Sequence, residues 1–218
     1  FGDFYFVFCC DMVMEKFKRV GDATIGIDFG LKNFLNLSDG TIVDSPEFYK
    51  ESLDKLKRAN KSFSKKKRGS NNRKKSLKNL QRVHRKVFNR REDFEWKLAH
   101  YLCKNNSFVA IEDLDIESMK RRWGRKVSDL SYSSFVLKLE QVANKYNTII
   151  QKIDRWYPSS KKCGCGVINE DLKLSDRVWT CKSCKTVNDR DLLASNNILS
   201  EGIRLCRTKY KTEIISAI

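Results

Sequence analysis

The 218-residue sequence predicts an α/β fold with a long basic helical hairpin and a small cysteine-rich insert. Three observations support this. Short apolar runs open the chain, a basic stretch with helical periodicity follows, and two close cysteine pairs come later. Acidic residues stand at the ends of the first and central strands and at the start of the last helix. Their order along the chain fits a ribonuclease H-like fold, in which those two strands lie side by side.

Residues 23–44, "ATIGIDFGLKNFLNLSDGTIVD", contain three apolar runs separated by tight turns. This pattern predicts three short antiparallel strands. Asp28 then lies in or beside the first strand. Gly26 and Gly30 flank it and leave room for a backbone or a ligand to approach closely.

A helical pattern runs from about Glu47 to Cys103. Ser45 and Pro46 suit the cap and the first position of its first helix. Residues 68–72, "RGSNN", interrupt the pattern before apolar residues resume at helical spacing. The segment therefore predicts a long helical hairpin.

The charge of the chain is concentrated on this hairpin. The formal net charge is +17, and residues 51–91 hold 17 Lys and Arg against two acids, which leaves only about +2 elsewhere. Such clustering favours a phosphate-binding surface, with a solvated charged face as the alternative. The candidate contacts on the hairpin are basic side chains around its turn: Lys65, Lys66, Lys67, Arg68, Arg73, Lys74, Lys75 and Arg82.

The remaining elements follow in a simple order. We expect a buried strand at 107–116, a polar loop at 117–133, an amphipathic helix at 134–147, a strand at 148–158 and a last helix at 191–203. No apolar run reaches the roughly 18 residues that span a membrane.

Acids occupy three corresponding positions: Asp28 on the first strand, Glu112 at the end of the central strand, and Asp189 and Asp191 at the start of the last helix. Acids that converge beside apolar strands repel one another and are costly without a bound cation. Mg²⁺ prefers oxygen ligands, and two ions about 4 Å apart would activate water and stabilise the leaving oxygen of a phosphodiester. Asp189 is the rival for the third position, and otherwise a helix cap. Lys32 and Asn33, just after the first acid, could contact a phosphate.

Two cysteine pairs have metal-ligand spacing. Cys181 and Cys184 form CxxC, whereas Cys163 and Cys165 form the shorter CxC. Four thiolates would close the shell of a structural zinc ion and leave no open site for water. The alternative is an unmetallated or three-ligand remnant. We expect residues 177–181, "RVWTC", to form the returning strand of a hairpin between the pairs. We expect the other cysteines to be ordinary apolar residues: Cys9, Cys10, Cys103 and Cys206.

Four motifs in fixed order, "GIDFGLKNF", "AIEDLDI", "DRWYPSSKKCGCG" and "VNDRDLLASNNI", resemble those of the TnpB (OrfB) family of insertion sequences. The resemblance implies a RuvC-like nuclease with an inserted zinc ribbon, and Asp28, Glu112 and Asp191 as its catalytic acids. It also implies RNA-guided cleavage of DNA, with guide RNA and target DNA as partners, in a bacterial or archaeal cytoplasm. Leu193 and Ser195 depart from the family pattern after the final acid.

The resemblance also predicts the domain limits. Residues 1–20 would be the remnant of a strand-rich, wedge-like domain, because the chain opens without methionine and with a strand-like run. Residues 21–157 would form the nuclease core with the hairpin at 47–103. Residues 158–188 would form the zinc ribbon, and 189–218 the last helix and tail.

Several alternatives stay open at this point. The chain could be a non-catalytic nucleic-acid-binding protein, such as a repressor. A strand-joining transposase has little support, because the only histidines, His84 and His100, lie in the helical segment. Residues 121–126, "RRWGRK", could be a lid or an ordinary basic loop. Trp156 and Tyr157 could stack on bases or pack in the core. The oligomeric state is open.

Overall fold

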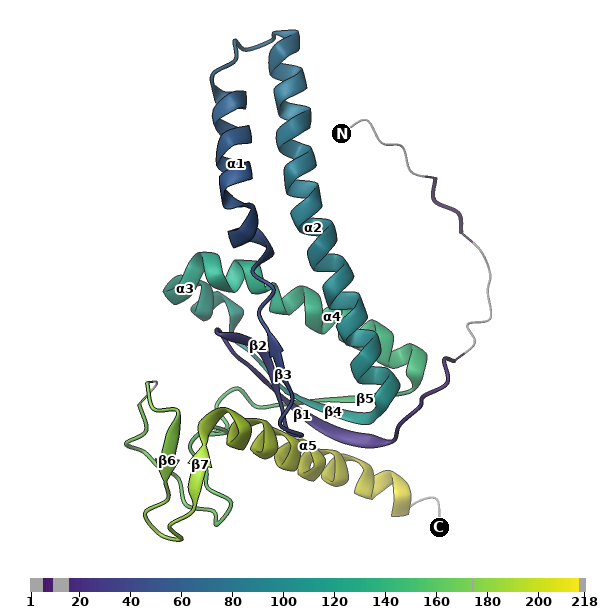
Figure 1. Cartoon of the computed structure of the whole chain (residues 1–218). Helices are drawn as coiled ribbons and strands as arrows, with labels where there is room; N and C mark the ends of the chain where they lie inside the picture. Colours follow the sequence, from purple (N-terminus) through teal and green to yellow (C-terminus); the bar gives the residue numbers. More distant parts are fainter. Residues whose placement is uncertain (1–5, 10–15, 174, 216–218) are drawn as a thin grey trace. The chain divides into compact units, whose positions relative to one another are not determined.

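The computed structural model describes residues 6–9, 16–173 and 175–215 (Figure 1). The chain divides into two units. The first contains the hairpin Glu47–Leu98, and the second contains Lys16–Pro46 together with the chain from Ala99 onward. The predictions that concern residues 1–5 and 10–15, including the one for Cys10, lie outside the described residues.

The hairpin unit consists of α1 (Phe48–Ser64) and the first part of α2 (Asn71–Asn105), so the predicted break near 68–72 is confirmed. The predicted cap is wrong. Glu47 precedes the helix in a left-handed conformation with φ 39°, which leaves Ser45 and Pro46 outside the first turn. At the hairpin tip, the guanidinium of Arg73 donates to the carbonyl of Lys66 at 2.9 Å and lies 4.2 Å above the Phe63 ring.

The second unit is built on a five-stranded sheet in the order β3-β2-β1-β4-β5. The strands are β1 (Ala23–Phe29), β2 (Asn33–Leu37), β3 (Ile42–Asp44), β4 (Asn106–Glu112) and β5 (Ile149–Ile153). The first three pair antiparallel, as predicted, and β1–β4 and β4–β5 pair parallel. The first and central strands are therefore neighbours.

Helices cover both faces of this sheet (Figure 1). On one face, α4 (Tyr132–Tyr146) buries Phe135 and Leu139 completely. Phe34 packs edge-on against Phe135, with ring centroids 5.3 Å apart. The other face is covered by α5 (Arg190–Ile215), which is longer than the predicted last helix.

The polar segment after β4 is helical, so the predicted loop is wrong. It forms α3 (Ile116–Leu130), whose first turn is capped where the Asp115 carboxylate accepts a hydrogen bond from the Ser118 amide at 3.0 Å. Val127 and Leu130 are buried and anchor its second half. Gly124 interrupts the helix with φ 15° and ψ −90°. The many charged residues hid this narrow apolar side from the periodicity argument.

The approach of α5 to the sheet depends on residues without side chains. Successive strand residues face opposite sides, so Gly26 and Asp28 share one face of β1. A Cβ added at Gly26 would lie 2.1 Å from the Ser195 carbonyl oxygen of α5. About two turns further along α5, a Cβ at Gly202 would lie 2.6 Å from the Ala110 side chain. The helix backbone therefore rests directly on β1 and β4.

The cysteine segment contains two short strands, β6 (Val178–Thr180) and β7 (Val187–Asp189), paired antiparallel. The strand predicted at 177–181 is present as β6. Its predicted partner is wrong, because β6 pairs with the strand after the second cysteine pair and not with residues between the pairs. The turn of this hairpin thus carries Cys181 and Cys184.

Residues 16–20, expected to belong to a preceding domain, bond to the second unit. The Phe17 amide donates to the Lys145 carbonyl and the Val20 amide to the Lys104 carbonyl, both at 2.8 Å. The assignment of residues 1–20 to a wedge-like remnant stays a prediction. No helix in the described part of the chain is both long and apolar enough to cross a bilayer.

Replacing Gly26 with alanine should push α5 away from β1, because the new methyl group overlaps the backbone of the helix. We expect a loss of about 1–3 kcal/mol in the free energy of unfolding, as for other overpacked sites. Ser200→Ala, on the exposed side of α5, is the matched control and should change it by less than about 0.5 kcal/mol. Equal unfolding curves for Gly26→Ala and the parent would contradict the close contact.

Candidate active site and cysteine cluster

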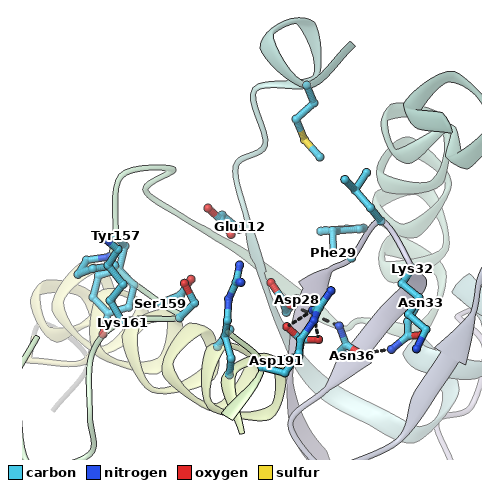
Figure 2. A pocket seen from close by; sticks show the side chains of 18 of the residues that line it. Asp28, Phe29, Lys32, Asn33, Asn36, Glu112, Tyr157, Ser159, Lys161 and Asp191 are labelled. Atoms are coloured by element: carbon cyan, nitrogen blue, oxygen red, sulfur yellow. Dashed lines mark hydrogen bonds and ion pairs between the residues drawn. The ribbon is translucent and has the colours of Figure 1, made fainter. Parts of the chain in front are cut away.

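A pocket of about 400 Å³ opens where β1 and β4 end and α5 begins (Figure 2). Ile27 of β1 pairs with Ile111 of β4, so the next residues of both strands reach the same edge. Asp28 and Glu112 line the pocket from these strands, and Asp191 lines it from the first turn of α5. The structure thus brings the three predicted acids to one pocket.

Asp28 is the most strongly perturbed of the three acids. Burial, followed by repulsion from Glu112 and Asp191, raises its pKa to about 7. The buried amide of Asn36 opposes this by donating to Asp28 at 3.4 Å, and the positive charge of Arg190 opposes it more weakly. A cation that enters the pocket would stabilise the charged form of this carboxylate.

Glu112 shows the same behaviour. Burial and the neighbouring charge of Asp113 raise its pKa to about 7. The carboxylate of Asp113 itself forms an ion pair with Arg155, which holds it outside the pocket. The two adjacent acids therefore have different surroundings. Glu112 lines the pocket, and Asp113 is neutralised by Arg155 outside it.

Asp191 is held by a basic partner. Arg177 Nη1 lies 2.8 Å and 3.2 Å from the two carboxylate oxygens of Asp191. Asp189, the rival acid, accepts hydrogen bonds from the amides of Asp191 at 3.1 Å and Leu192 at 2.9 Å. It caps α5 and does not line the pocket.

The other predicted pocket residues also lie there. Lys32 and Asn33 line the wall after β1, and the Asn33 amide donates to Asn36 Oδ1 at 3.0 Å. Sequence reasoning missed Asn36 and Arg177. Asn36 lies among the successive buried residues of β2, and Arg177 stands directly before "VWTC". Neither position carries a pattern that indicates function by itself.

Asn197 was also missed, and it fixes the opposite wall. Its side-chain amide donates to the carbonyls of Ser159 at 2.7 Å and Lys162 at 2.6 Å. These bonds tie the loop before the first cysteine pair to α5. Ser159 and Lys161 of this loop face the pocket (Figure 2).

The four predicted cysteines form one cluster, with all their Sγ atoms within 4.8 Å of one another. Cys163 and Cys184 are 3.6 Å apart, as are Cys165 and Cys181. Thiolates around one tetrahedral zinc lie about 3.8 Å apart at usual Zn–S distances. Both members of the short CxC pair therefore reach the cluster, which could bind a structural zinc.

The surroundings favour thiolates at Cys181 and Cys184, where hydrogen bonds lower the pKa. At Cys165 a bond from the Val167 backbone is outweighed by contact with the other thiols and by burial, which raise its pKa to about 11. Hydrogen bonding with the hydroxyl and backbone of Thr186 lowers the pKa of Cys184 to about 6. The buried amide of Asn188 approaches Cys163 Sγ at 3.8 Å. Trp179 packs against the cluster, and so does Leu193 of α5, one of the two departures from the family pattern.

In the described part of the chain, the cysteines are the one group of possible metal ligands that meets this close spacing. The three carboxylates share a pocket at wider spacing, with Asp191 turned to Arg177. A cation at the pocket would have to draw this side chain away from the guanidinium.

The hairpin candidates lie on the separate unit and are not part of the pocket. Arg73 is committed to the hairpin tip by its contacts with Lys66 and Phe63. The other predicted contacts are all exposed: Lys65, Lys66, Lys67, Arg68, Lys74, Lys75 and Arg82.

Trp156 and Tyr157, the two aromatic residues predicted either to stack on bases or to pack in the core, differ in exposure. Trp156 is 84% exposed, so core packing is wrong for this residue. Tyr157 packs against the core around Phe108 and lines the pocket. Residues 121–126 belong to α3 and not to a loop, and Trp123 among them lines the pocket.

Comparison with known proteins decides the family. A family model described as "Probable transposase" (OrfB_IS605) matches residues 8–122, more than half of the chain. The chain belongs to the OrfB, or TnpB, family. A second model, the TNB domain of Cas12f1-like proteins, matches residues 132–198 of this TnpB-family chain.

Among curated relatives, a Streptomyces pristinaespiralis protein named "Putative RNA-guided DNA endonuclease" is 38% identical over 184 residues. The match covers 83% of this TnpB-family chain and 46% of that protein. The TnpB-like protein L79 of Acanthamoeba polyphaga mimivirus is 28% identical, over 82% of the chain and 37% of its own length. The chain spans less than half of the length of these relatives.

Solved structures show the same fold. A CRISPR-Cas12f ternary complex matches with a TM-score of 0.61 at 19% identity, over 87% of this chain and 40% of that one. A Cas12f1–sgRNA–target DNA complex matches with a TM-score of 0.59 at 20% identity, over 83% and 40%. The predicted α/β class is confirmed as a mixed α/β fold that resembles Cas12f.

The raised pKa of Asp28 predicts a pH-dependent stability without divalent ions. The folded protein binds this proton more tightly than the unfolded chain, so the free energy of unfolding should fall as pH rises from 3.8 towards 7. Asp28→Asn should reduce this fall and melt above the parent at pH 8. Thermal melts across this range in buffer without added Mg²⁺ provide the measurement. Parallel curves for variant and parent would contradict the assignment.

Proposed function

We propose that this chain is the nuclease part of an RNA-guided DNA endonuclease, with a RuvC-like ribonuclease H core that hydrolyses DNA phosphodiesters. The convergence of Asp28, Glu112 and Asp191 on one pocket is the observation that carries this. Names of relatives support it, since they describe RNA-guided DNA endonucleases. The bacterial or archaeal cytoplasm stays a prediction for its location.

The pocket residues fit Mg²⁺ by chemistry. Carboxylate oxygens are the ligands that this ion prefers, and repulsion among Asp28, Glu112 and Asp191 favours a divalent cation between them. The donors are oxygen atoms without thiol or imidazole, which argues against a soft metal. Bound there, a pair of Mg²⁺ ions would supply an activated water and neutralise the charge that develops on the leaving oxygen.

The chain's own residues would orient the substrate. Lys32 and Lys161 line opposite walls of the pocket, where their ammonium groups can bind phosphate oxygens on either side of the reacting bond. Asn36, buried and bonded to both Asn33 and Asp28, keeps the first acid aimed into the pocket. Arg177 lines the same pocket, and a cation that displaces it from Asp191 would leave its guanidinium available to a phosphate.

The cysteine cluster would hold a structural zinc in a ribbon inserted before α5. Four thiolates close its coordination shell, so this ion would not take part in hydrolysis. The position of the cluster in the fold suggests a structural role at the start of α5. Leu193 packs against the cluster two residues after Asp191, and Asn188 at its base lies just before Asp189. The cluster would therefore fix the start of α5 and with it the third acid.

The hairpin would bind the guide RNA and target DNA through their phosphates. Its exposed basic residues surround the tip, and contacts of this kind carry affinity without reading sequence. Base pairing would supply the specificity, as in other RNA-guided effectors. Within the predicted limits, residues 21–157 and 189–218 form the core and 158–188 the ribbon.

A binding protein without catalysis is the second candidate. The wide carboxylate spacing and the Arg177–Asp191 ion pair favour it, because they leave the third acid committed elsewhere. A Mg²⁺ titration with labelled single-stranded DNA separates the two candidates: cleavage supports the nuclease, and binding alone supports the repressor.

Replacing Asp28 with alanine should lower Mg²⁺-dependent DNA cleavage by at least about 10³-fold while RNA binding persists, since the variant loses a metal ligand. Asp39→Asn is the control, because this exposed acid lies in the turn between β2 and β3 and lines neither the pocket nor the hollow beside it. It should retain cleavage. Full cleavage by Asp28→Ala would rule out the assigned site.

Replacing Cys165 with serine should reduce the zinc content below one ion per chain and lower the melting temperature, because one of four ligands is lost. Cys9→Ser, at an exposed position, is the matched control and should keep the parent's zinc. Metal analysis of the purified proteins measures both. Full zinc content in Cys165→Ser would show that the CxC pair supplies only Cys163.

Changing Lys65, Lys66 and Lys67 together to alanine should weaken RNA binding. The slope of log K against log salt concentration should become less steep, by an amount that corresponds to at most about three phosphate contacts. Lys97, paired with Asp93 at 2.8 Å near the base of the hairpin, provides a control substitution. Filter binding at several salt concentrations gives the slope. An unchanged slope would show that the tip does not contact phosphates.

A further inference from the structure

A second hollow, of about 320 Å³, adjoins the carboxylate pocket. It lies between the end of β4, the first half of α3 and the loop after β5. Glu112, Met119 and Trp123 line both cavities and form their common wall. A nucleic-acid strand held at the carboxylates therefore passes directly beside the second hollow.

Two indole rings line this hollow. The side chain of Trp123 is 38% exposed and that of Trp156 is 84% exposed. Single exposed apolar residues are common on protein surfaces, but two tryptophans around one cavity beside a reactive pocket form a stacking platform. The turn that carries Trp156 is fixed, because its amide donates to Asp154 Oδ1 at 2.7 Å.

The wall of the hollow carries more acidic than basic side chains, which disfavours a phosphate there. Glu112, Asp113 and Asp115 line it together with two arginines, Arg122 and Arg155. Asp113 is partnered by Arg155 and Asp115 by Ser118, so both are satisfied without a ligand. The remaining lone pairs of these carboxylates can accept hydrogen bonds from the amino edge of a base.

We propose that this hollow binds one unpaired nucleobase of the DNA strand that is being cut, stacked against Trp123 and Trp156 beside the reacting phosphate. The inference rests on the proposed function and adds a subsite to it. Holding one base out of the stack would keep the strand single-stranded at the pocket and place the neighbouring phosphate at the carboxylates. Bases that carry amino groups would bind better than thymine.

The test measures binding of short single-stranded DNA to the full chain carrying Asp28→Asn, which prevents cleavage. Trp123→Ala and Trp156→Ala should each raise Kd about tenfold, as expected for the loss of one stacked base. Trp156→Phe should restore most of the affinity because a ring remains. Tyr101→Ala, at a 59% exposed aromatic on α2, is the control and should leave Kd unchanged.

An abasic series separates stacking from a structural role. A set of oligonucleotides, each lacking one base at a successive position, is bound to the parent and to Trp156→Ala. At one position the missing base should raise the Kd of the parent about tenfold. With that oligonucleotide, Trp156→Ala should cause no further change in Kd. If the substitution weakens every oligonucleotide equally, or weakens none, the inference is overturned. Circular dichroism melts confirm that the variants are folded.

A Mg²⁺ cleavage assay of the protein with Asp28 intact, run beside the abasic series, distinguishes this inference from the proposed function. If the protein with Asp28 intact does not cleave DNA in Mg²⁺ but the abasic pattern appears, the subsite stands and the nuclease assignment fails. If Mg²⁺-dependent cleavage depends on Asp28 but no position shows the pattern, the nuclease assignment stands and the subsite fails.

Discussion

The contact between α5 and β1 at Gly26 is the constraint on which the rest of the second unit depends. It brings the helix backbone against the strand, with no space for a methyl group. Asp28 lies two residues further along the same face of β1, and Asp191 lies one turn before the contact on α5. The separation of the backbone positions that carry the first and third acids is therefore set by this contact.

Two further anchors orient the start of α5. Asn197 ties the helix to the loop that forms one wall of the pocket, and Leu193 packs against the cysteine cluster. The cluster and the carboxylates are thus separate sites with a common support. A metal bound at the cysteines would stabilise the pocket through the helix it holds, and its loss would loosen the third acid.

The sequence was most informative where a residue type has one physical use. The alternation around Asp28 and the run before Glu112 predicted two strands correctly, and cysteine spacing predicted a cluster that includes the short CxC pair. It was least informative where contacts are distant. The helix at 116–130 was missed because its buried residues are few, and Arg177 because its role appears only when the chain brings it to Asp191. The partner of β6 could not be predicted because three residues carry too little pattern to fix pairing.

If the proposed site is correct, the three carboxylates hold divalent ions once the Arg177–Asp191 ion pair opens. A crystal structure of the chain with Mn²⁺, with anomalous scattering used to locate the ions, can show where they bind. We expect anomalous peaks bounded by the oxygens of Asp28, Glu112 and Asp191, with the Arg177 ion pair broken. No peak at these carboxylates, with Asp191 still bound to Arg177, would rule the site out.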